Sequence, residues 1–415
     1  MAKSDVMNSN IADTKTVMAT CPACGLLCDD VLAENNQNKI SVLANSCAKS
    51  IAFFEQSIVD TTPQISGKPA TLAQAVAKAA QILKAAQKPL FAGSSTDVQG
   101  FRAIYHLAQK TNATLQHMNA TSSQRNLRVL QSSGWQMTTL TEVKNRADVM
   151  VCIGTDIVTH NPRFFERFIQ QDGMFIGAEQ REIIFIGENI QKNDAPRFKH
   201  SRAGLGGTSL LACRAVDLPV ITLALRALVL GKKLIATQVA GVNTSDLQTV
   251  ADKLKQAKYA VLAWVAKDLD FPHAELSVQN ITEIVAALNQ SSRAAGLQLG
   301  GSDGDTSINY ANTWLSGLTL GDNPSIQHDA VVWVNSFSPE KNPPDSGLPT
   351  IVLGNPNSRP ASEPDVFIPI ATPGLDCYGM LFRVDGSVTL PLKKLRETGL
   401  PTLGDVISQI EGQLG

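Results

Sequence analysis

Short apolar runs alternate along the chain with stretches whose apolar residues recur at helical spacing, and this alternation constrains the fold most strongly. The runs predict buried strands at Pro89–Ala92, Val149–Gly154, Ile183–Ile186, Tyr259–Ala266, Leu297–Leu299, Val331–Val334 and Ile351–Gly354. Helices are predicted between them, at about 72–83, 98–110, 124–132, 220–230, 246–256 and 275–288. Repeated strand–helix units with apolar strands favour parallel sheets covered on both faces, so we predict an α/β fold.

The order of these elements predicts five segments in the 415 residues. Residues 1–18 are polar and are expected to form a flexible N-terminus, and residues 19–62 form a cysteine-rich segment with a hairpin around the polar turn at 34–38. Residues 63–235 predict a first α/β region, and residues 236–362 predict a second. Residues 363–415 carry further strand candidates and are expected to return to the core.

The charges nearly cancel, because 36 Lys and Arg stand against 37 Asp and Glu, which leaves a net charge of −1. Proteins that bind nucleic acid or anionic membranes normally carry a basic excess, so both classes are disfavoured. The longest apolar stretch, 218–230, is interrupted by Arg226 and is too short to span a bilayer. The first fifteen residues lack the apolar centre of a secretory signal. We therefore expect a soluble, cytoplasmic protein.

Four of the seven cysteines are clustered, in the pattern C-x2-C-x3-C-x18-C formed by Cys21, Cys24, Cys28 and Cys47. Clustered thiols in a reducing compartment indicate metal or redox chemistry, whereas scattered ones usually pack as small hydrophobic residues. Four thiolates can ligate a [4Fe–4S] cluster or enclose one tetrahedral Zn²⁺. A zinc ribbon would usually show two C-x2-C knuckles, which are missing. An iron–sulfur cluster, a zinc ion and unligated packing thiols all remain open.

No other motif in the sequence assembles an acid, a base and a nucleophile. Gly-rich turns at 93–96 and 204–208 could hold a phosphate but are read more simply as loops, because both dinucleotide and P-loop fingerprints are missing. The histidines, among them His106, His117 and His160, are dispersed without paired metal-ligand spacing. The acidic pairs at 29–30 and 303–305 are interpreted as turn residues.

Three segments, taken together, resemble the B subunit of formylmethanofuran dehydrogenase, a molybdopterin-dependent oxidoreductase. The first is CPACGLLCDD at 21–30 with NSC at 45–47, and the second is TEVKNRADV at 141–149 followed by HNPR at 160–163. The third is the C-terminal stretch from IPI at 368–370 through FRVDG at 382–386. The resemblance runs in order from about residue 18 to residue 395. It implies a molybdopterin-oxidoreductase-like scaffold, with a small cysteine-rich domain and two Rossmann-like parallel-sheet regions.

The chain departs from the family pattern where the metal would be bound. The resemblance places Ser122 and Ser123 at the positions of a Cys-His pair that binds and flanks tungsten or molybdenum, and it places Gly300 at the position of an arginine over the metal. A neutral hydroxyl is a poor substitute for a soft thiolate on such a metal. No tungstopterin or molybdopterin is therefore expected. The four cysteines remain as candidate ligands of a [4Fe–4S] cluster.

This combination is similar to the B subunit of the bacterial formyltransferase/hydrolase complex. The resemblance implies an auxiliary, non-catalytic role beside the A, C and D subunits, in tetrahydromethanopterin-linked oxidation of formaldehyde to formate, with methylofuran as the cofactor of the complex. Lys144, Arg146 and Arg163 could meet the polyglutamate tail of methylofuran, or they could pair within the chain with Glu142 and Asp148. The alternative function is a working formylmethanofuran dehydrogenase that holds a metallopterin, and a third is a zinc-binding structural protein.

Overall fold

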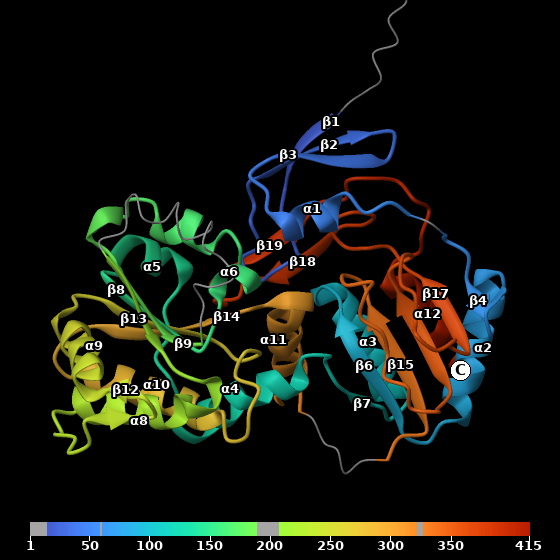
Figure 1. Cartoon of the computed structure of the whole chain (residues 1–415). Coiled ribbons are helices and arrows are strands. Elements are labelled where there is room, and N and C mark those ends of the chain that lie inside the picture. Colours follow the sequence, from blue (N-terminus) through green and yellow to red (C-terminus); the bar gives the residue numbers. More distant parts are fainter. Residues whose placement is uncertain (1–14, 59, 189–206, 322–326) are drawn as a thin grey trace, which may run out of the picture.

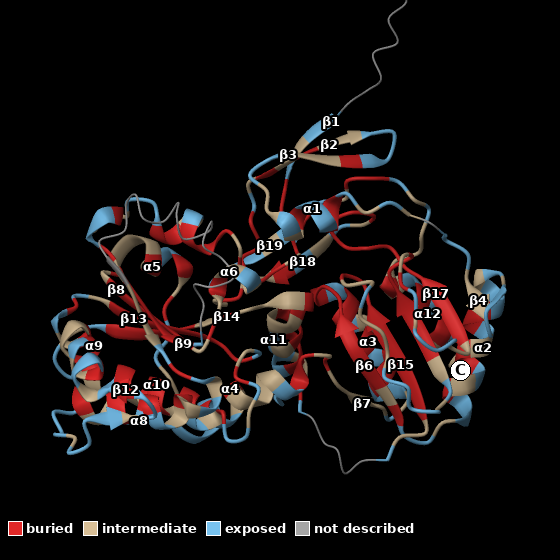
Figure 2. Cartoon of the chain, in the orientation of Figure 1, coloured by how far each residue is buried: buried red, intermediate tan, exposed pale blue. Residues whose placement is uncertain are grey.

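The computed structural model describes residues 15–58, 60–188, 207–321 and 327–415 (Figure 1). The chain forms two α/β lobes, and the cysteine-rich segment lies above their junction. Within the described residues, no helix has the length and apolar character needed to cross a bilayer. Buried residues lie along the strands and on the helix faces turned toward them in both lobes (Figure 2).

The cysteine-rich segment is a three-stranded antiparallel sheet followed by a short helix. Its strands are β1 (Lys15–Ala19), β2 (Val31–Asn36) and β3 (Lys39–Ala44), and helix α1 (Ala48–Phe54) begins directly after Cys47. The predicted hairpin is confirmed as β2–β3. Residues 15–18, which the sequence placed in a flexible terminus, belong to β1, because their backbone pairs with residues 32–35 of β2.

One lobe contains a seven-stranded sheet in the order β5-β4-β17-β16-β15-β6-β7. Its strands are β4 (Gln64–Ile65), β5 (Lys68–Pro69), β6 (Pro89–Ser95), β7 (Thr114–Leu115), β15 (Ala330–Asn335), β16 (Thr350–Gly354) and β17 (Val366–Pro369). Helices α2 (Leu72–Ala85), α3 (Val98–Lys110), α11 (Asp305–Ser316) and α12 (Leu403–Leu414) cover one face. The other face buries a smaller cluster, Ala92, Trp333, Val352 and Phe367, which includes no described helical residue, so this face is covered without the described helices.

The other lobe contains a fully parallel five-stranded sheet in the order β10-β9-β8-β13-β14. Its strands are β8 (Val149–Ile153), β9 (Glu182–Gly187), β10 (Gly207–Ala212), β13 (Ala260–Val265) and β14 (Ala294–Leu299). Helices α8 (Leu218–Val229), α9 (Thr244–Gln256) and α10 (Glu275–Leu288) pack on one face, together with α4 (Ala120–Ser133). The opposite face packs against α5 (Leu140–Arg146) and the π-helical turn η1 (Phe165–Ile169). This sheet is covered on both faces, as the apolar strands predicted.

Shorter elements complete the two lobes. They are α6 (Ile157–His160), the hairpin β11 (Gln238–Val239) and β12 (Val242–Asn243), the single turns η2 (Ala178–Gln180), η3 (Ala215–Asp217) and η4 (Ser302–Gly304), and the hairpin β18 (Gly379–Phe382) and β19 (Thr389–Leu392). The β18–β19 hairpin lies beneath the cysteine-rich segment (Figure 1).

The sheets divide the chain differently from the predicted boundary at residue 235. Strands β8–β10 before that boundary and β13–β14 after it share one sheet, whereas β6 pairs with β15, more than 200 residues later. The five-stranded lobe is therefore inserted between the two halves of the seven-stranded lobe. Periodicity identifies strands, but it carries no information on which distant strands pair, and this explains the difference.

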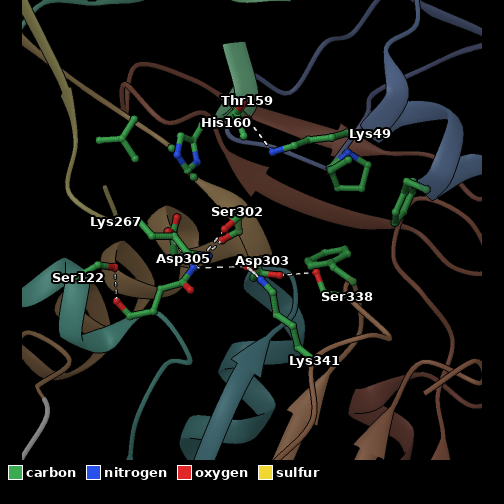
Figure 3. A pocket seen from close by; sticks show the side chains of 18 of the residues that line it. Lys49, Ser122, Thr159, His160, Lys267, Ser302, Asp303, Asp305, Ser338 and Lys341 are labelled. Atoms are coloured by element: carbon green, nitrogen blue, oxygen red, sulfur yellow. Dashed lines mark hydrogen bonds and ion pairs between the residues drawn. The ribbon is translucent and has the colours of Figure 1, made fainter. Parts of the chain in front are cut away.

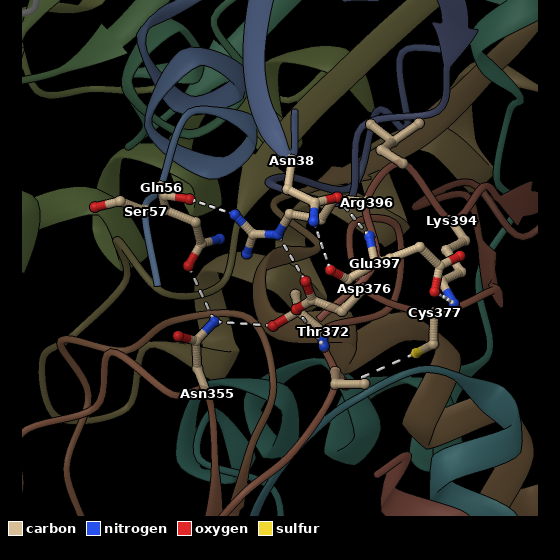
Figure 4. A network of polar contacts seen from close by, with 12 residues as sticks. Asn38, Gln56, Ser57, Asn355, Thr372, Asp376, Cys377, Lys394, Arg396 and Glu397 are labelled. Atoms are coloured by element: carbon tan, nitrogen blue, oxygen red, sulfur yellow. Dashed lines mark hydrogen bonds and ion pairs between the residues drawn. The ribbon is translucent and has the colours of Figure 1, made fainter. Parts of the chain in front are cut away.

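The C-terminal segment 363–415 contributes β17 and α12 to the seven-stranded lobe and then fixes the cysteine-rich segment (Figure 4). A buried ion pair joins Arg396 Nε to Asp376 Oδ1 at 2.7 Å, and the same guanidinium donates to the carbonyl of Gln56 at 2.6 Å. Asn355, at the end of β16, donates to the side chains of Gln56 and Thr372, both at 3.0 Å. Three remote parts of the chain meet in this network.

Candidate functional site

A cavity of about 490 Å³ opens where the carboxyl ends of strands from both sheets face one another. In α/β proteins this edge is the usual place for ligands. Six stretches supply most of the wall: residues 22–23 and 49–56 of the cysteine-rich segment, 119–126 at the start of α4, 265–267 after β13, 298–305 after β14 and 337–341 after β15; Thr159, His160 and Asn357 also line it. Figure 3 shows side chains from these stretches turned toward one space. The cavity thus belongs to both lobes and to the cysteine-rich segment.

The loop after β14 is held in an unusual backbone conformation at this wall. Gly300, Gly301, Asp303 and Gly304 all have positive φ, and for Asp303 the value is 61°. A side chain other than Gly or Asn is uncommon there, so neighbouring contacts must fix it. The Asp303 carboxylate accepts from Ser338 and forms an ion pair with Lys341, and His117 contacts its backbone carbonyl at 3.2 Å.

The pKa values of two carboxyl groups in this loop are shifted in opposite directions. Burial disfavours the charged form of Asp303, but the Lys341 ammonium and the hydrogen bonds from Lys341 and Ser338 outweigh it and lower its pKa to about 2. Burial raises the pKa of Asp305, and burial lowers the pKa of His117. The sequence interpretation of 303–305 as plain turn residues missed that Asp303 and Asp305 line a cavity.

Ser122, Ser123 and Gly300, which the sequence resemblance predicts to replace metal-site residues of the family, all line this cavity. Ser122 Oγ donates to the carbonyl of Asn119 at 2.9 Å, within the first turn of α4. The described residues that line the cavity offer hydroxyl, amide, carboxyl, imidazole and ammonium groups but no thiol. The described wall therefore offers no thiolate that could bind a metal.

Cys21, Cys24, Cys28 and Cys47 line a second, much smaller cavity, together with Lys49 and Arg163. The first three lie on one loop, which the hydrogen bond from Cys21 N to Cys28 O closes at 2.9 Å. Burial raises the pKa of the Cys21 and Cys28 thiols, and burial together with the Cys28 charge raises the pKa of Cys24 to about 11. The structure thus brings the four cysteines of the motif together. Within the described ranges, no group of three or more His, Cys, Asp or Glu side chains is arranged to hold a metal ion.

Lys49 stands between the two cavities, since it lines both. Its ammonium donates to the carbonyl of His160 at 2.9 Å, and the His160 ring contacts Asp268 at 2.6 Å. Sequence reasoning missed Lys49, Lys267 and Lys341 as wall residues. Lys267 follows the β13 strand closely, so the rule that ligands bind at carboxyl ends of parallel strands could have found it. No sequence signal marks Lys341.

The basic residues of the second sequence motif are paired within the chain. Arg146 pairs with Glu142 at 2.6 Å, as the intrachain alternative predicted, whereas Lys144 donates to Gln171. Arg163 pairs with Asp30 and Glu166 instead of Glu142 or Asp148. Asp148 accepts hydrogen bonds from backbone amides at residues 258–259.

The glycine-rich turn at 93–96 does not form a phosphate loop. The turn at 93–96 is the end of β6 and the approach to α3, and the Asp97 carboxylate accepts from the amide of Gly100 at the start of that helix. A carboxylate in that position repels an anion, so the simpler interpretation as a strand-to-helix turn fits. Residues 204–206 of the other turn lie outside the described residues, and Gly207 begins β10.

Comparison with known proteins finds relatives of two kinds, both of them B subunits. The chain is 27% identical over 414 residues to the B subunit of the tungsten-containing formylmethanofuran dehydrogenase 2 of Methanococcus maripaludis, and the match covers 90% of this chain and 92% of the relative. It is 26% identical over 352 residues to the B subunit of the formyltransferase/hydrolase complex of Methylorubrum extorquens, covering 77% of this chain and 87% of the relative. No family model matches the chain.

Two solved structures share the fold. The formyltransferase/hydrolase complex of Methylorubrum extorquens, solved with methylofuran, contains a chain that superposes with a TM-score of 0.70 at 22% identity, covering 85% of this chain and 98% of that one. Acetylene hydratase from Pelobacter acetylenicus superposes with a TM-score of 0.63 at 10% identity, covering 97% of this chain and 69% of that one. The chain is thus a homologue of the B subunits of formylmethanofuran dehydrogenase and of the formyltransferase/hydrolase complex.

Proposed function

We propose that this chain is the B subunit of a cytoplasmic formyltransferase/hydrolase complex in which the A, C and D subunits are its partners. In that role it supports the tetrahydromethanopterin-linked oxidation of formaldehyde to formate, with methylofuran as the cofactor of the complex. The homology to both kinds of B subunit and the fold shared with a chain of the methylofuran-containing complex support this assignment. The chain acts as a scaffold and does not itself catalyse a step.

The observation that carries the proposal is the donor set of the 490 Å³ cavity. Ser122 stands where the family has its metal-binding cysteine, and its hydroxyl is already bonded to Asn119 O. To bind the metal, this hydroxyl would have to lose its proton and its bond to Asn119, and the described wall offers no thiol in its place. The residues present do not fit a tungstopterin centre, so we derive no redox step at this cavity.

We also propose that Cys21, Cys24, Cys28 and Cys47 form the ligand set of a [4Fe–4S] cluster. The four thiols share one small cavity, and Lys49 and Arg163 add positive charge to its wall. In such a cluster each thiolate binds a different iron, so the sulfur atoms need not converge on one point as they would around a single Zn²⁺. The cluster would supply a one-electron couple, and without a metallopterin beside it the cluster would chiefly cross-link the segment.

The partner subunits need a surface, and α8 offers apolar side chains for this purpose. Val220, Leu223 and Leu230 are 44%, 50% and 47% exposed, and Val216 just before the helix is 56% exposed. Large exposed apolar groups that recur on one helix often mark protein contacts. Under the proposal, these side chains become buried when the complex assembles.

The test is purification of the complex from its native host, followed by elemental analysis and an activity assay. We expect the A, C and D subunits to accompany the chain, iron to be bound, and tungsten and molybdenum to be below stoichiometric amounts. The complex should release formate from formyl-tetrahydromethanopterin without an electron acceptor. Replacement of Ser122 by Ala should leave formate release unchanged, because the proposal gives this side chain no catalytic role.

Stoichiometric tungsten or molybdenum would overturn the proposal and favour the second candidate, an active formylmethanofuran dehydrogenase with a metallopterin and a [4Fe–4S] cluster. The similarity to the tungsten-containing enzyme over 90% of this chain is the observation behind that candidate. In that case Ser122→Ala should abolish an electron-acceptor-dependent activity. One zinc per chain and a colourless protein would instead indicate a zinc site at the four cysteines.

A further inference from the structure

We propose that Arg163 is the positioning residue of the four-cysteine site, because its guanidinium fixes the loop that carries Cys28 against the loop that carries Cys47. This inference rests on the proposed role of the four cysteines as ligands. It assigns a structural role to the arginine of the HNPR motif at 160–163, for which the proposed function gives no role.

The guanidinium of Arg163 joins the two ligand loops directly. It forms a bidentate pair with the Asp30 carboxylate, at 2.7 and 2.9 Å, and Asp30 lies two residues after Cys28. The same guanidinium donates to the carbonyl of Asn45 at 2.6 Å, and Asn45 lies two residues before Cys47. The Asn45 side-chain amide in turn donates to the carbonyl of Asp30 at 2.9 Å. These bonds set the spacing between the three-cysteine loop and the fourth cysteine.

We call the hydrogen bonds that join Arg163, Asp30 and Asn45 the clamp. Its arginine belongs to the five-stranded lobe rather than to the cysteine-rich segment. Arg163 follows α6, and its Nη2 donates to Glu166 at 2.7 Å, which fixes the orientation of the guanidinium. Two residues earlier, the buried Asn161 side chain exchanges hydrogen bonds of 3.0 and 3.1 Å with the backbone of Gly300. One short stretch therefore holds the cysteine loops on one side and the loop of the large cavity on the other.

Because Arg163 is buried and makes several hydrogen bonds, another side chain cannot easily take its place. Its side chain is 5% exposed and lines the cysteine cavity itself. Three different acceptors, Asp30, Asn45 O and Glu166, occupy the planar fork at once. The single ammonium of a lysine cannot present donors in that fixed geometry. By contrast, the neighbouring Arg167 pairs with Asp29 at 2.8 Å and with Asp30 at 3.8 Å, so its ion pairs are both with the three-cysteine side of the clamp.

The experiment compares the full-length wild-type chain with Arg163→Gln, Arg163→Lys and Asp30→Asn, each reconstituted anaerobically with iron and sulfide. Arg102→Gln is the matched control, because the Arg102 guanidinium donates to Gln99 on its own helix, α3, and neither residue lines the cavity of the four cysteines. Iron and sulfide per chain and the electron paramagnetic resonance signal after dithionite are measured. We expect Arg163→Gln to hold iron about tenfold more weakly against a chelator, which is the usual effect of losing a group that orients metal ligands. Arg163→Lys and Asp30→Asn should lie between it and the wild type.

A second readout needs no iron. In the metal-free protein, the alkylation rate of Cys47 is compared with that of Cys377 by mass spectrometry, because Cys377 lies outside the clamp. Arg163→Gln should raise the rate for Cys47 several-fold and leave Cys377 unchanged. If Arg163→Gln does not fold, Asp30→Asn breaks the same clamp from the other side and should give both effects.

The outcomes separate the inference from the proposed function. A wild-type chain that takes up no iron would refute the cluster, and the alkylation ratio would then decide alone whether Arg163 positions the thiols. A wild-type chain that binds iron, with variants that retain it as firmly and show an unchanged alkylation ratio, would overturn the inference.

Discussion

At the scale of single residues, the buried ion pair between Arg396 and Asp376 is one in which loss of a single partner should cost much stability. Their side chains are 4% and 0% exposed. Arg396→Met leaves the Asp376 carboxylate buried without its partner, so we expect the free energy of unfolding to fall by about 3–5 kcal/mol. Urea unfolding followed by circular dichroism measures this change. The double variant with Asp376→Asn removes the stranded charge and should recover much of the loss; a double variant as unstable as the single one would contradict this explanation.

The thiol of Cys377, in the same network, should make the folded protein less stable in alkaline solution. Burial, with a further contribution from the Asp97 and Asp376 carboxylates, raises the pKa of its thiol from 9.0 to about 12. Below pH 9 the thiol is protonated in both the folded and the unfolded chain, so its ionisation does not lower the free energy of unfolding there. Above that pH only the unfolded chain ionises, and stability falls as the pH rises toward 12. Between about pH 9 and pH 10.5 the loss should reach about 2 kcal/mol.

The measurement is the urea midpoint of wild type and Cys377→Ala at pH values on either side of that window. Cys377→Ala should show a smaller decrease from the lower to the higher pH, whatever its stability at neutral pH. Parallel decreases in the two proteins would show that another group causes the alkaline effect.

At the scale of elements, Gly25 is the point where the cysteine loop, the loop after β14 and the C-terminal hairpin meet. Its amide donates to the carbonyl of Gly300 at 3.1 Å, and its carbonyl accepts from Val384 at 2.9 Å. A Cβ atom at this position would lie 2.6 Å from Gly300 O and 2.7 Å from Val384 Cβ. Backbone atoms cannot move aside as the end of a flexible side chain can. The cysteine loop, the loop after β14 and the C-terminal hairpin would therefore have to move apart.

We therefore expect Gly25→Ala to lower the free energy of unfolding by about 1–3 kcal/mol, the usual cost of overpacking, or by more. Thermal unfolding checks this value. Gly412→Ala is the matched control, because a Cβ atom there meets nothing within 4 Å inside α12, and it should be neutral or slightly stabilising. Equal effects of the two substitutions would show that the close contact at Gly25 is unimportant.

At the scale of the whole molecule, the cysteine-rich segment shares its core with the five-stranded lobe. One buried cluster contains Phe53 and Phe54 of α1, Phe164 near η1, Val261 of β13 and Leu392 of β19. Because these residues bury one another's surface, removing one part exposes the apolar face of the rest. The segment 19–62 is compact in sequence but does not have a core of its own.

This predicts that a fragment of residues 15–62 does not fold alone. Its circular dichroism spectrum should be that of an unfolded chain, without a cooperative thermal transition, and the remaining fragment 63–415 should bind a hydrophobic dye more strongly than the whole protein. Mixing the two fragments should restore part of the ordered signal. A cooperative transition in the isolated segment would contradict the shared core.

The local sequence pattern was sufficient to predict the bounds of helices and strands that are amphipathic or apolar and regular. Helices α3 and α10 have the predicted bounds, 98–110 and 275–288, and the strands β8, β13, β15 and β16 lie within one or two residues of their apolar runs. Helices α1, α11 and α12 were missed. Helix α11 follows a glycine-rich loop and has no side-chain N-cap, so the acidic Asp305 is the one helix-start signal in its first turn.

The amino-acid sequence by itself determined the α/β class and the cysteine motif, because these depend on residue type and local spacing. Only the tertiary structure decided that β6 pairs with β15, that Arg163 joins two cysteine loops and that Asp303 meets Lys341 at a cavity wall. Such contacts join residues that are tens to hundreds of positions apart, and the packing of the complete chain selects them. Local spacing carries no record of that selection.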